Sequence, residues 1–241
     1  NSFIKTMLAC LAGIIIAGAL SVFALVSLIG AATSMGSDDE GIKENSVLML
    51  DFDGTFGERA DENPFSSLMN DGKNSYGLED VIASIKEAKK NPDIKGIYLQ
   101  AGTMEIQFAS LEEIRGELES FKESGKFVVA YGDQYSEWLY YLASVADKVI
   151  VNPEGSISWH GLAAQPIFFK DLLEKVGVEM QIFKVGTYKS AVEPFIATEM
   201  SDANREQVTE YIASIWNDVV NAVSQSRGID AGRLNEYADR Y

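Results

Sequence analysis

The sequence predicts an α/β fold, in which parallel strands alternate with crossover helices, preceded by one amino-terminal transmembrane helix. Two observations support this prediction. An uncharged apolar run occupies residues 7–32, and after it short apolar runs alternate with segments of helical periodicity. Strands that alternate with helices favour parallel pairing and right-handed crossovers. We therefore expect a signal anchor at 1–33, a polar linker at 34–45 and one α/β domain at 46–241.

The apolar run is longer than the about 20 residues that cross a bilayer. It is also longer than the apolar core of a cleaved signal, which has about 7–15 residues. An uncleaved, single-pass anchor in the inner or cell membrane is expected, with Cys10 buried in the bilayer. Lys5 precedes the run and acidic residues follow it, so the positive-inside rule places the amino terminus in the cytoplasm. The rest of the chain is expected to be extracytoplasmic, in the periplasm.

The α/β domain is expected to contain five strands and five main helices. Apolar residues at helical spacing, the S-L-E-E capping box at 110–113 and helix-ending glycines at 125 and 177 mark the boundaries. The strands are predicted at 46–52, 94–99, 126–131, 148–151 and 178–185. The helices are predicted at 77–91, 110–124, 135–145, 166–176 and 201–226, with a long loop at 59–76.

Charge and composition exclude several classes of site. The net charge is −16, whereas nucleic-acid binding needs clustered basic side chains. With one histidine, His160, and one cysteine inside the apolar run, the chain cannot assemble a zinc shell. No glycine-rich phosphate loop is present. We expect no metal, no cofactor and no nucleic-acid partner, and we expect His160 to hydrogen-bond a turn.

A first candidate site is the Asp-x-Asp-Gly-Thr sequence that contains Asp51 and Asp53 at the end of the first predicted strand. It resembles the first motif of haloacid dehalogenase-type phosphatases, in which the first aspartate attacks phosphorus beside a magnesium ion. The acidic pair that such a site needs downstream has one counterpart here, Asp133, without a partner. A magnesium-dependent phosphatase and a plain Asp-Gly turn both remain open.

The second candidate is Lys189, in the sequence GTYKSAVEPF at 186–195, just after the last predicted strand. Ends of strands are where α/β sheets place their chemistry. A lysine can lose its proton when it is desolvated and then act as a base. The neighbouring Glu193 would oppose that change, so its side chain is expected to point away from Lys189. From the residues alone, a catalytic base and an ordinary solvated lysine are both possible.

Several segments resemble, in order, the signal peptide peptidase A (protease IV) family in its long form with two repeats. They are the anchor and the sequences at 140–144, 149–155, 159–162 and 185–195. The resemblance implies a crotonase/Clp-protease type of fold and a Ser/Lys-dyad endopeptidase that degrades cleaved signal peptides and other unfolded hydrophobic peptides. It implies that Lys189 is the general base and that the protein forms a homo-oligomer, a tetramer.

The chain departs from a complete peptidase at the nucleophile. The place that matches the family's serine lies near 137–139 and has no Ser-Gly pair, while Ser136 and Ser190 lack the expected setting. The serine is therefore expected outside this chain, in a second repeat beyond residue 241. A non-catalytic scaffold and a membrane-tethered binding module also remain open.

Overall fold

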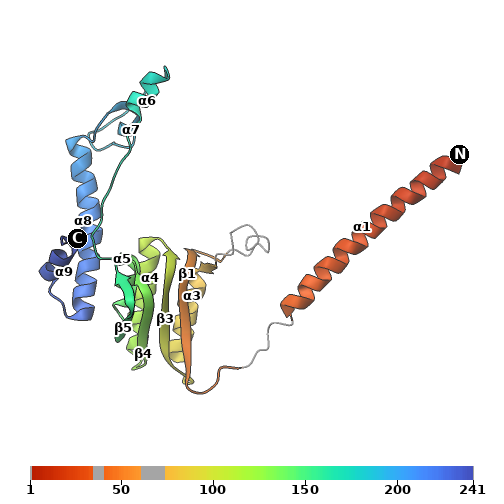
Figure 1. Ribbon diagram of the computed structural model, residues 1–241, viewed down its shortest axis with the longest axis horizontal. Helices are drawn as coiled ribbons and strands as arrows, with labels where there is room; N and C mark the ends of the chain where they lie inside the picture. The colour runs from red at the N-terminus through yellow and green to blue at the C-terminus, as the bar shows by residue number, and fades with distance from the viewer. Residues whose placement is uncertain (1, 35–40, 61–73, 241) are drawn as a thin grey trace. The chain divides into compact units, whose positions relative to one another are not determined.

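The computed structural model describes residues 2–34, 41–60 and 74–240 of the chain (Figure 1). The chain divides into two compact units, Asn1–Lys43 and Glu44–Tyr241. Half of the predicted linker and most of the predicted loop at 59–76 lie outside the described residues.

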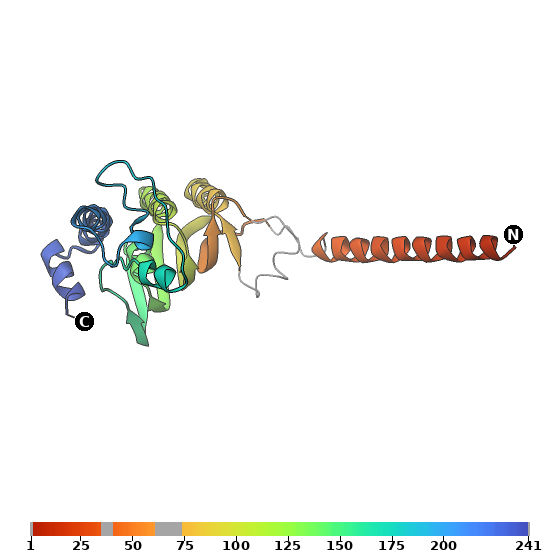
Figure 2. The same cartoon turned by 90° about the horizontal axis from the view of Figure 1, so that it is seen from above.

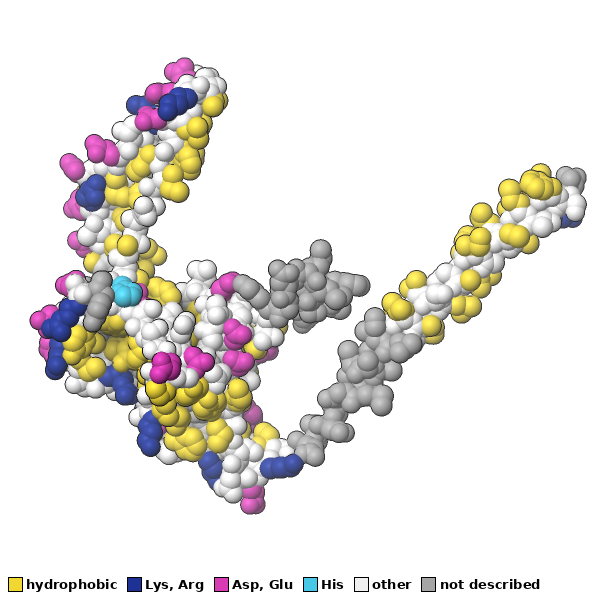
Figure 3. Space-filling view, viewed as in Figure 1, with side chains coloured by type: hydrophobic (Ala, Val, Ile, Leu, Met, Phe, Trp, Pro, Cys, Tyr) yellow, Lys and Arg dark blue, Asp and Glu magenta, His cyan; other side chains and the backbone are white. Residues whose placement is uncertain are grey.

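The first unit consists of one helix, α1 (Ser2–Ser34). Its residues Ser2–Ser27 have a mean hydropathy of 2.6 and are long and apolar enough to cross a membrane, judged by length and composition. The large apolar side chains along them are exposed, shown in yellow in Figure 3, and Ile14 and Phe23 are among those exposed. A helix that is apolar all round needs an apolar surrounding, which a bilayer supplies.

The second unit is built on a five-stranded sheet in which every pair of neighbours is parallel. The strand order is β2-β1-β3-β4-β5. The strands are β1 (Ser46–Gly57), β2 (Ser75–Gly77), β3 (Ile94–Glu105), β4 (Phe127–Tyr135) and β5 (Lys148–Ile157). The α/β fold with parallel strands, crossover helices and an amino-terminal apolar helix is thus confirmed.

Helices α3 (Leu78–Lys90) and α4 (Phe108–Lys122) lie on the same side of the sheet, where Figure 2 shows them nearly end-on. The alternation along β1 explains this, because Leu50, Phe52 and Phe56 are buried in the core whereas Met49 is exposed. The predicted apolar face of α3 is confirmed. Its buried residues are Leu78, Val81, Ile82, Ile85 and Ala88.

Helix α5 (Glu137–Ala143) connects β4 to β5, and the long helix α8 (Asp202–Arg227) is followed by α9 (Ala231–Ala238). Ser201 caps α8 by accepting from the Asn204 amide, and Gly228 ends it with a φ of 65°. A positive φ favours glycine at that position. The carboxy-terminal turns of α8 pack in the core through Val219, Val220 and Val223.

One buried cation, Arg115 on α4, ties three helices together. Its guanidinium donates to the carbonyl oxygen of Tyr141 and to Ser144 Oγ at the end of α5. It also donates to the Ala222 carbonyl oxygen and to Ser226 Oγ near the end of α8. Burial lowers the pKa of Arg115, which is 3% exposed. Helix ends carry unpaired carbonyl groups, so a buried cation is favourable there.

Several predicted boundaries are wrong. Strands β1, β3, β4 and β5 are each longer than predicted, because their far ends continue to pair after the apolar runs stop. Helix α4 begins after Gln107, before the predicted capping box, and Ser110 bonds to Glu58 instead. The helix predicted at 166–176 is reduced to α6 (Lys170–Lys175).

The strand predicted at 178–185 does not form. A strand needs a neighbouring strand to pair its backbone groups. Within the described residues this segment pairs with none, and its side chains are open to solvent, with Phe183 97% and Val185 88% exposed. The segment has the apolar pattern of a strand, but within the described residues no neighbouring strand pairs with it.

Candidate functional site

The lysine motif lies on an arm, residues 158–201, that leaves the end of β5 and returns to the start of α8 (Figure 1). The arm carries the short helices α6 and α7 (Glu193–Ile196). The two helices are joined where the Phe169 amide donates to the Pro194 carbonyl at 2.6 Å. The rings of Phe169 and Phe195 stack with their centres 6.2 Å apart. The arm therefore folds back on itself beside α8.

Lys189 sits on an exposed turn of this arm. The turn begins at Gly186, whose φ of 100° favours glycine. It is held on one side by Tyr188, which donates to Glu206 on α8 at 3.1 Å. On the other side the Glu193 amide donates to the Ser190 carbonyl at 2.9 Å. The ammonium group of Lys189 makes no hydrogen bond or ion pair to any residue that the structure describes.

The Glu193 carboxylate makes no ion pair with Lys189 and is bonded to other residues. Its carboxylate accepts from Ser201 Oγ at 2.7 Å, from the Ser201 amide and from Asn204 Nδ2, and it pairs with Lys184 at 3.4 Å. Chiefly because of the Ser201 hydroxyl, the pKa of this carboxyl is lowered to about 2. Glu193 is buried, at 4% exposure. Its carboxylate connects the tip of the arm, helix α7, to the start of α8.

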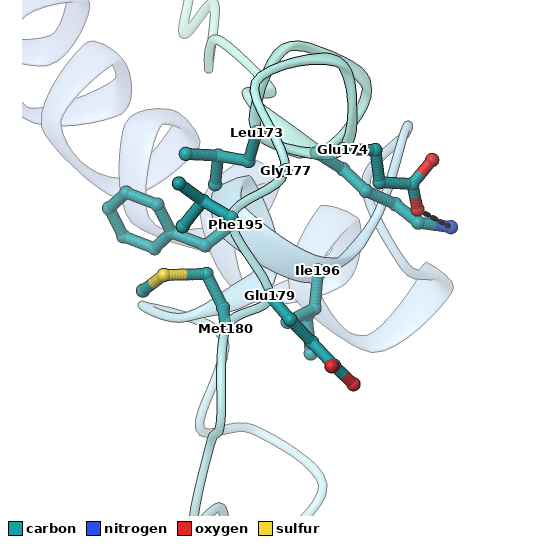
Figure 4. A pocket seen from close by; sticks show the side chains of 9 residues that line it. Leu173, Glu174, Gly177, Glu179, Met180, Phe195 and Ile196 are labelled. Carbon is teal, nitrogen blue, oxygen red and sulfur yellow. Dashed lines mark ion pairs between the residues drawn. The ribbon is translucent and has the colours of Figure 1, made fainter.

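A hollow of about 410 Å³ opens on the arm beside this motif (Figure 4). Leu173, Met180 and Phe195 point into one region of it, and charged residues stand at its rim. The nearest charged pair is Lys170 with Glu174, at 3.8 Å. The lining consists of Lys170, Leu173, Glu174, Gly177, Val178, Glu179, Met180, Phe195 and Ile196. Such an apolar hollow with a polar rim suits an apolar side chain.

Neither serine near the sequence motifs is paired with Lys189. Ser136 caps α5, and its Oγ accepts from the Leu139 amide at 3.3 Å. Glu137, at the place that the resemblance gives to a nucleophile, instead accepts from the backbone amides of His160 and Gly161. His160 thus bonds through its backbone amide, in a segment without regular structure, and its side chain is exposed. The described residues bring no serine to Lys189.

The Asp-x-Asp-Gly-Thr sequence does not form a turn at a strand end, because β1 continues through it to Gly57. Asp53 Oδ1 accepts from the Thr103 amide at 2.9 Å, and Asp133 accepts from Asn152 at 2.9 Å. In the part of the chain that the structure describes, no three His, Cys, Asp or Glu side chains are grouped to hold a metal ion. This arrangement gives the phosphatase hypothesis no support.

Comparison with known proteins identifies the family. The sequence model of "Peptidase family S49" matches residues 120–241. This chain belongs to peptidase family S49. It is 35% identical over 227 residues to "Protease 4" of Haemophilus influenzae, which covers 91% of this chain and 37% of that protein. The "Protease 4" of Salmonella typhi is 34% identical over 225 residues, which is 88% of this chain and 36% of that protein.

A more distant relative is the "Putative signal peptide peptidase SppA" of Enterococcus faecium, 22% identical over 202 residues, 83% of this chain and 56% of that protein. These matches confirm the signal peptide peptidase A family and its crotonase/Clp-protease type of fold. The chain spans little more than a third of the two Protease 4 relatives that it matches.

Sequence reasoning missed two features of the site. The bonds of Glu193 to Ser201 and Asn204 could have been suspected, since Ser201 was predicted to begin a helix and an acidic residue is favourable there. The bonds from Glu137 to the His160 and Gly161 amides join residues 23 and 24 positions apart. No local pattern signals a contact of that kind.

Proposed function

We propose that this chain is the anchored, base-carrying half of a Ser/Lys serine endopeptidase that degrades cleaved signal peptides and other unfolded hydrophobic peptides. Lys189 is the general base, and the nucleophilic serine is supplied from outside residues 1–241. The dyad uses neither a metal nor a cofactor. Membership of family S49 supports the reaction class, and the setting of Lys189 carries the assignment of the base.

The setting of Lys189 suits a base that is completed by another surface. A lysine is a base only when its amine is neutral, and a nearby carboxylate would favour the charged form. The acidic residue of the motif, Glu193, is engaged with Ser201, Asn204 and Lys184. Within the described chain, Glu193 therefore makes no ion pair with Lys189.

The apolar side chains around Lys189 support a covering surface. Phe183 and Val185 precede the turn and are almost fully exposed, and Ile167 on the arm is 67% exposed. Side chains of this size are normally buried against another surface. Contact with the part of the protein that carries the serine would bury them and desolvate the Lys189 amine. We propose that this part is a second repeat, within the same chain or in a neighbour of a homo-oligomer, a tetramer by resemblance.

In the proposed reaction the neutral Lys189 amine takes the proton of the serine hydroxyl as its oxygen attacks the peptide carbonyl. The lysine then gives this proton to the leaving amine, so that an acyl-enzyme remains. A water molecule, activated by the same amine, hydrolyses the ester and restores the serine. The hollow lined by Leu173, Met180 and Phe195 would receive an apolar side chain of the extended substrate.

Helix α1 supports the choice of substrate, because an anchor would hold the site near peptides released in the membrane. We propose a single pass through the inner membrane, with the amino terminus in the cytoplasm and residues 46–241 in the periplasm. Lys5 before the apolar run and the acidic residues after it favour this orientation.

The test uses the full-length protein and a fluorogenic hydrophobic peptide. Lys189→Ala should lower kcat at least about 1,000-fold, the scale expected when a base that activates a nucleophile is removed. Lys189→Arg should be equally inactive, because arginine keeps its proton. Lys175→Ala on α6 is the matched control, an exposed lysine of the same arm, and should leave kcat unchanged. Hydrolysis by Lys189→Arg at the wild-type rate would refute the role of the base.

A further inference from the structure

Two backbone amides at the root of the arm share one carboxylate oxygen. The backbone amides of His160 and Gly161, the third and fourth residues of the arm, both donate to Oε1 of Glu137. Glu137 is the first residue of α5 and is half-buried. A charged acceptor makes stronger hydrogen bonds than a neutral one. Two consecutive amides are thereby fixed against a helix that packs on the sheet.

The contact of Glu137 is directed at the arm and not at its own helix. The amino-terminal cap of α5 is already made by Ser136, whose hydroxyl accepts from the Leu139 amide. A first-turn glutamate normally interacts with the free amides of its own helix. Here the side chain instead reaches two amides that lie beyond β5.

Aromatic contacts surround the same root. The Trp159 indole donates to the Leu234 carbonyl at 2.9 Å, and its ring lies 5.0 Å from that of Trp216 on α8. Gly161 has a φ of 82°, and a Cβ placed there would lie 3.9 Å from the Trp216 ring. The backbone therefore passes close to α8 at the point where Glu137 holds it. The path of the outgoing half of the arm is set at this point.

The rest of the arm on its outgoing side has few ties to the sheet. Between Gly161 and α6 the chain forms no regular structure, and most of its side chains are exposed. Its later bonds, from Phe169 to Pro194 and from Tyr188 to Glu206, join the arm to itself and to α8. A shift at the root would therefore move the outgoing half of the arm relative to the sheet.

We infer that Glu137 is a positioning residue, whose Oε1 fixes the root of the arm and, together with the bonds of Tyr188 and Glu193 to α8, the placement of Lys189. The inference rests on the proposed function for its catalytic part, and its structural part stands without it. Catalysis is sensitive to such placement, because a misplacement of about 1 Å can lower a rate about 100-fold.

The test compares Glu137→Ala with Glu137→Gln in the full-length protein in detergent. Both amides bond to one oxygen, so glutamine, with its carbonyl oxygen in the same place, should keep both bonds, whereas alanine keeps neither. Trypsin cleavage after Lys170, which is half-buried on α6, measures how often the arm opens. Glu137→Ala should raise this rate about tenfold, and Glu137→Gln should match the wild type. Glu210→Ala, an exposed carboxylate on α8, is the matched control and should leave the rate unchanged.

Peptide hydrolysis provides the second measurement. Glu137→Ala should lower kcat at least about tenfold with KM within a factor of two, and Glu137→Gln should restore it. Arm cleavage equal in Glu137→Ala and wild type would overturn the inference, as would equal changes in the Ala and Gln variants. Faster cleavage throughout the chain, with a lower unfolding midpoint, would also overturn it, since the effect would be general destabilisation.

The failure of each claim can be told apart from the failure of the other. If the wild-type protein hydrolyses no peptide, the proposed function fails, and trypsin cleavage of the arm still decides the role of Glu137. If Lys189→Ala abolishes hydrolysis while Glu137→Ala leaves kcat and arm cleavage unchanged, the dyad stands and the positioning role is refuted.

Discussion

Replacing Arg115 with methionine tests the physical account of how α4, α5 and α8 are held together. Methionine keeps most of the apolar stem but removes every donor of the guanidinium. Because α8 anchors the returning end of the arm, this contact also bears on the candidate site. The chain offers a control in Arg205→Met, the same change at an exposed position of α8.

The expected magnitude follows from the groups that Arg115 leaves behind. The carbonyl oxygens of Tyr141 and Ala222 lose the charged donor but keep the hydroxyl groups of Ser144 and Ser226. The loss is therefore that of hydrogen bonds to a charged group, which contribute about 1.5–3 kcal/mol each. The ion-pair partner, Glu119, is 54% exposed and returns to water at little cost. We therefore expect Arg115→Met to lower the free energy of unfolding by about 2–4 kcal/mol.

Urea unfolding of the detergent-solubilised chain, followed by circular dichroism, measures this change. The midpoint should fall while the slope with denaturant stays constant, which indicates lost stability without a change in compactness. Arg205→Met should change the free energy of unfolding by less than about 0.5 kcal/mol. A loss below about 1 kcal/mol in Arg115→Met, or an equal loss in the control, would refute the assignment of Arg115 as the tie between the helices.

Two further predictions concern the tip of the arm and the glycines of the second unit. The pKa of Glu193 is about 2 in the fold against an ordinary 4.5, so its stabilising effect is present above about pH 4.5 and is lost as the pH falls towards 2. Hydrogen exchange at Ser201 should therefore accelerate over that interval, and Glu193→Gln should remove the pH dependence; a flat wild-type profile would contradict this. Gly155→Ala should cost about 1–3 kcal/mol, because its Cβ would lie 2.0 Å from the Asp133 carbonyl oxygen. Gly116→Ala, in open space on α4, should instead add about 0.5–1 kcal/mol, and the same sign for both in urea unfolding would count against the packing argument.

The sequence was sufficient to predict an element wherever the interacting residues lie close together in the chain. The apolar spacing of α3 predicted its buried face, because residues three and four apart share one side of a helix. The helix predicted to begin at Ser201 does begin there, because the Ser201 hydroxyl accepts from a free amide of the first turn. Four of the five predicted strands formed, and the alternation with helices correctly indicated parallel pairing.

The sequence was insufficient to predict an element whose formation depends on contacts with residues far away in the chain. Residues 178–185 have the pattern of a strand, but within the described chain no neighbour pairs with them. Helix α4 begins before the predicted capping box at Ser110. Packing of this helix on the sheet outweighs the about 1 kcal/mol that a cap contributes.

By itself, then, the sequence determined the α/β class, the apolar amino-terminal helix and Lys189 as the residue to test, because periodicity, hydropathy and a specific motif are local properties. The tertiary structure alone showed that Lys189 lies on an exposed arm, that Glu193 bonds to Ser201 and Asn204 and that Glu137 binds two amides at the root of that arm. These are contacts between side chains and distant backbone groups. Their free energy depends on where the fold places both partners, and no local pattern records it.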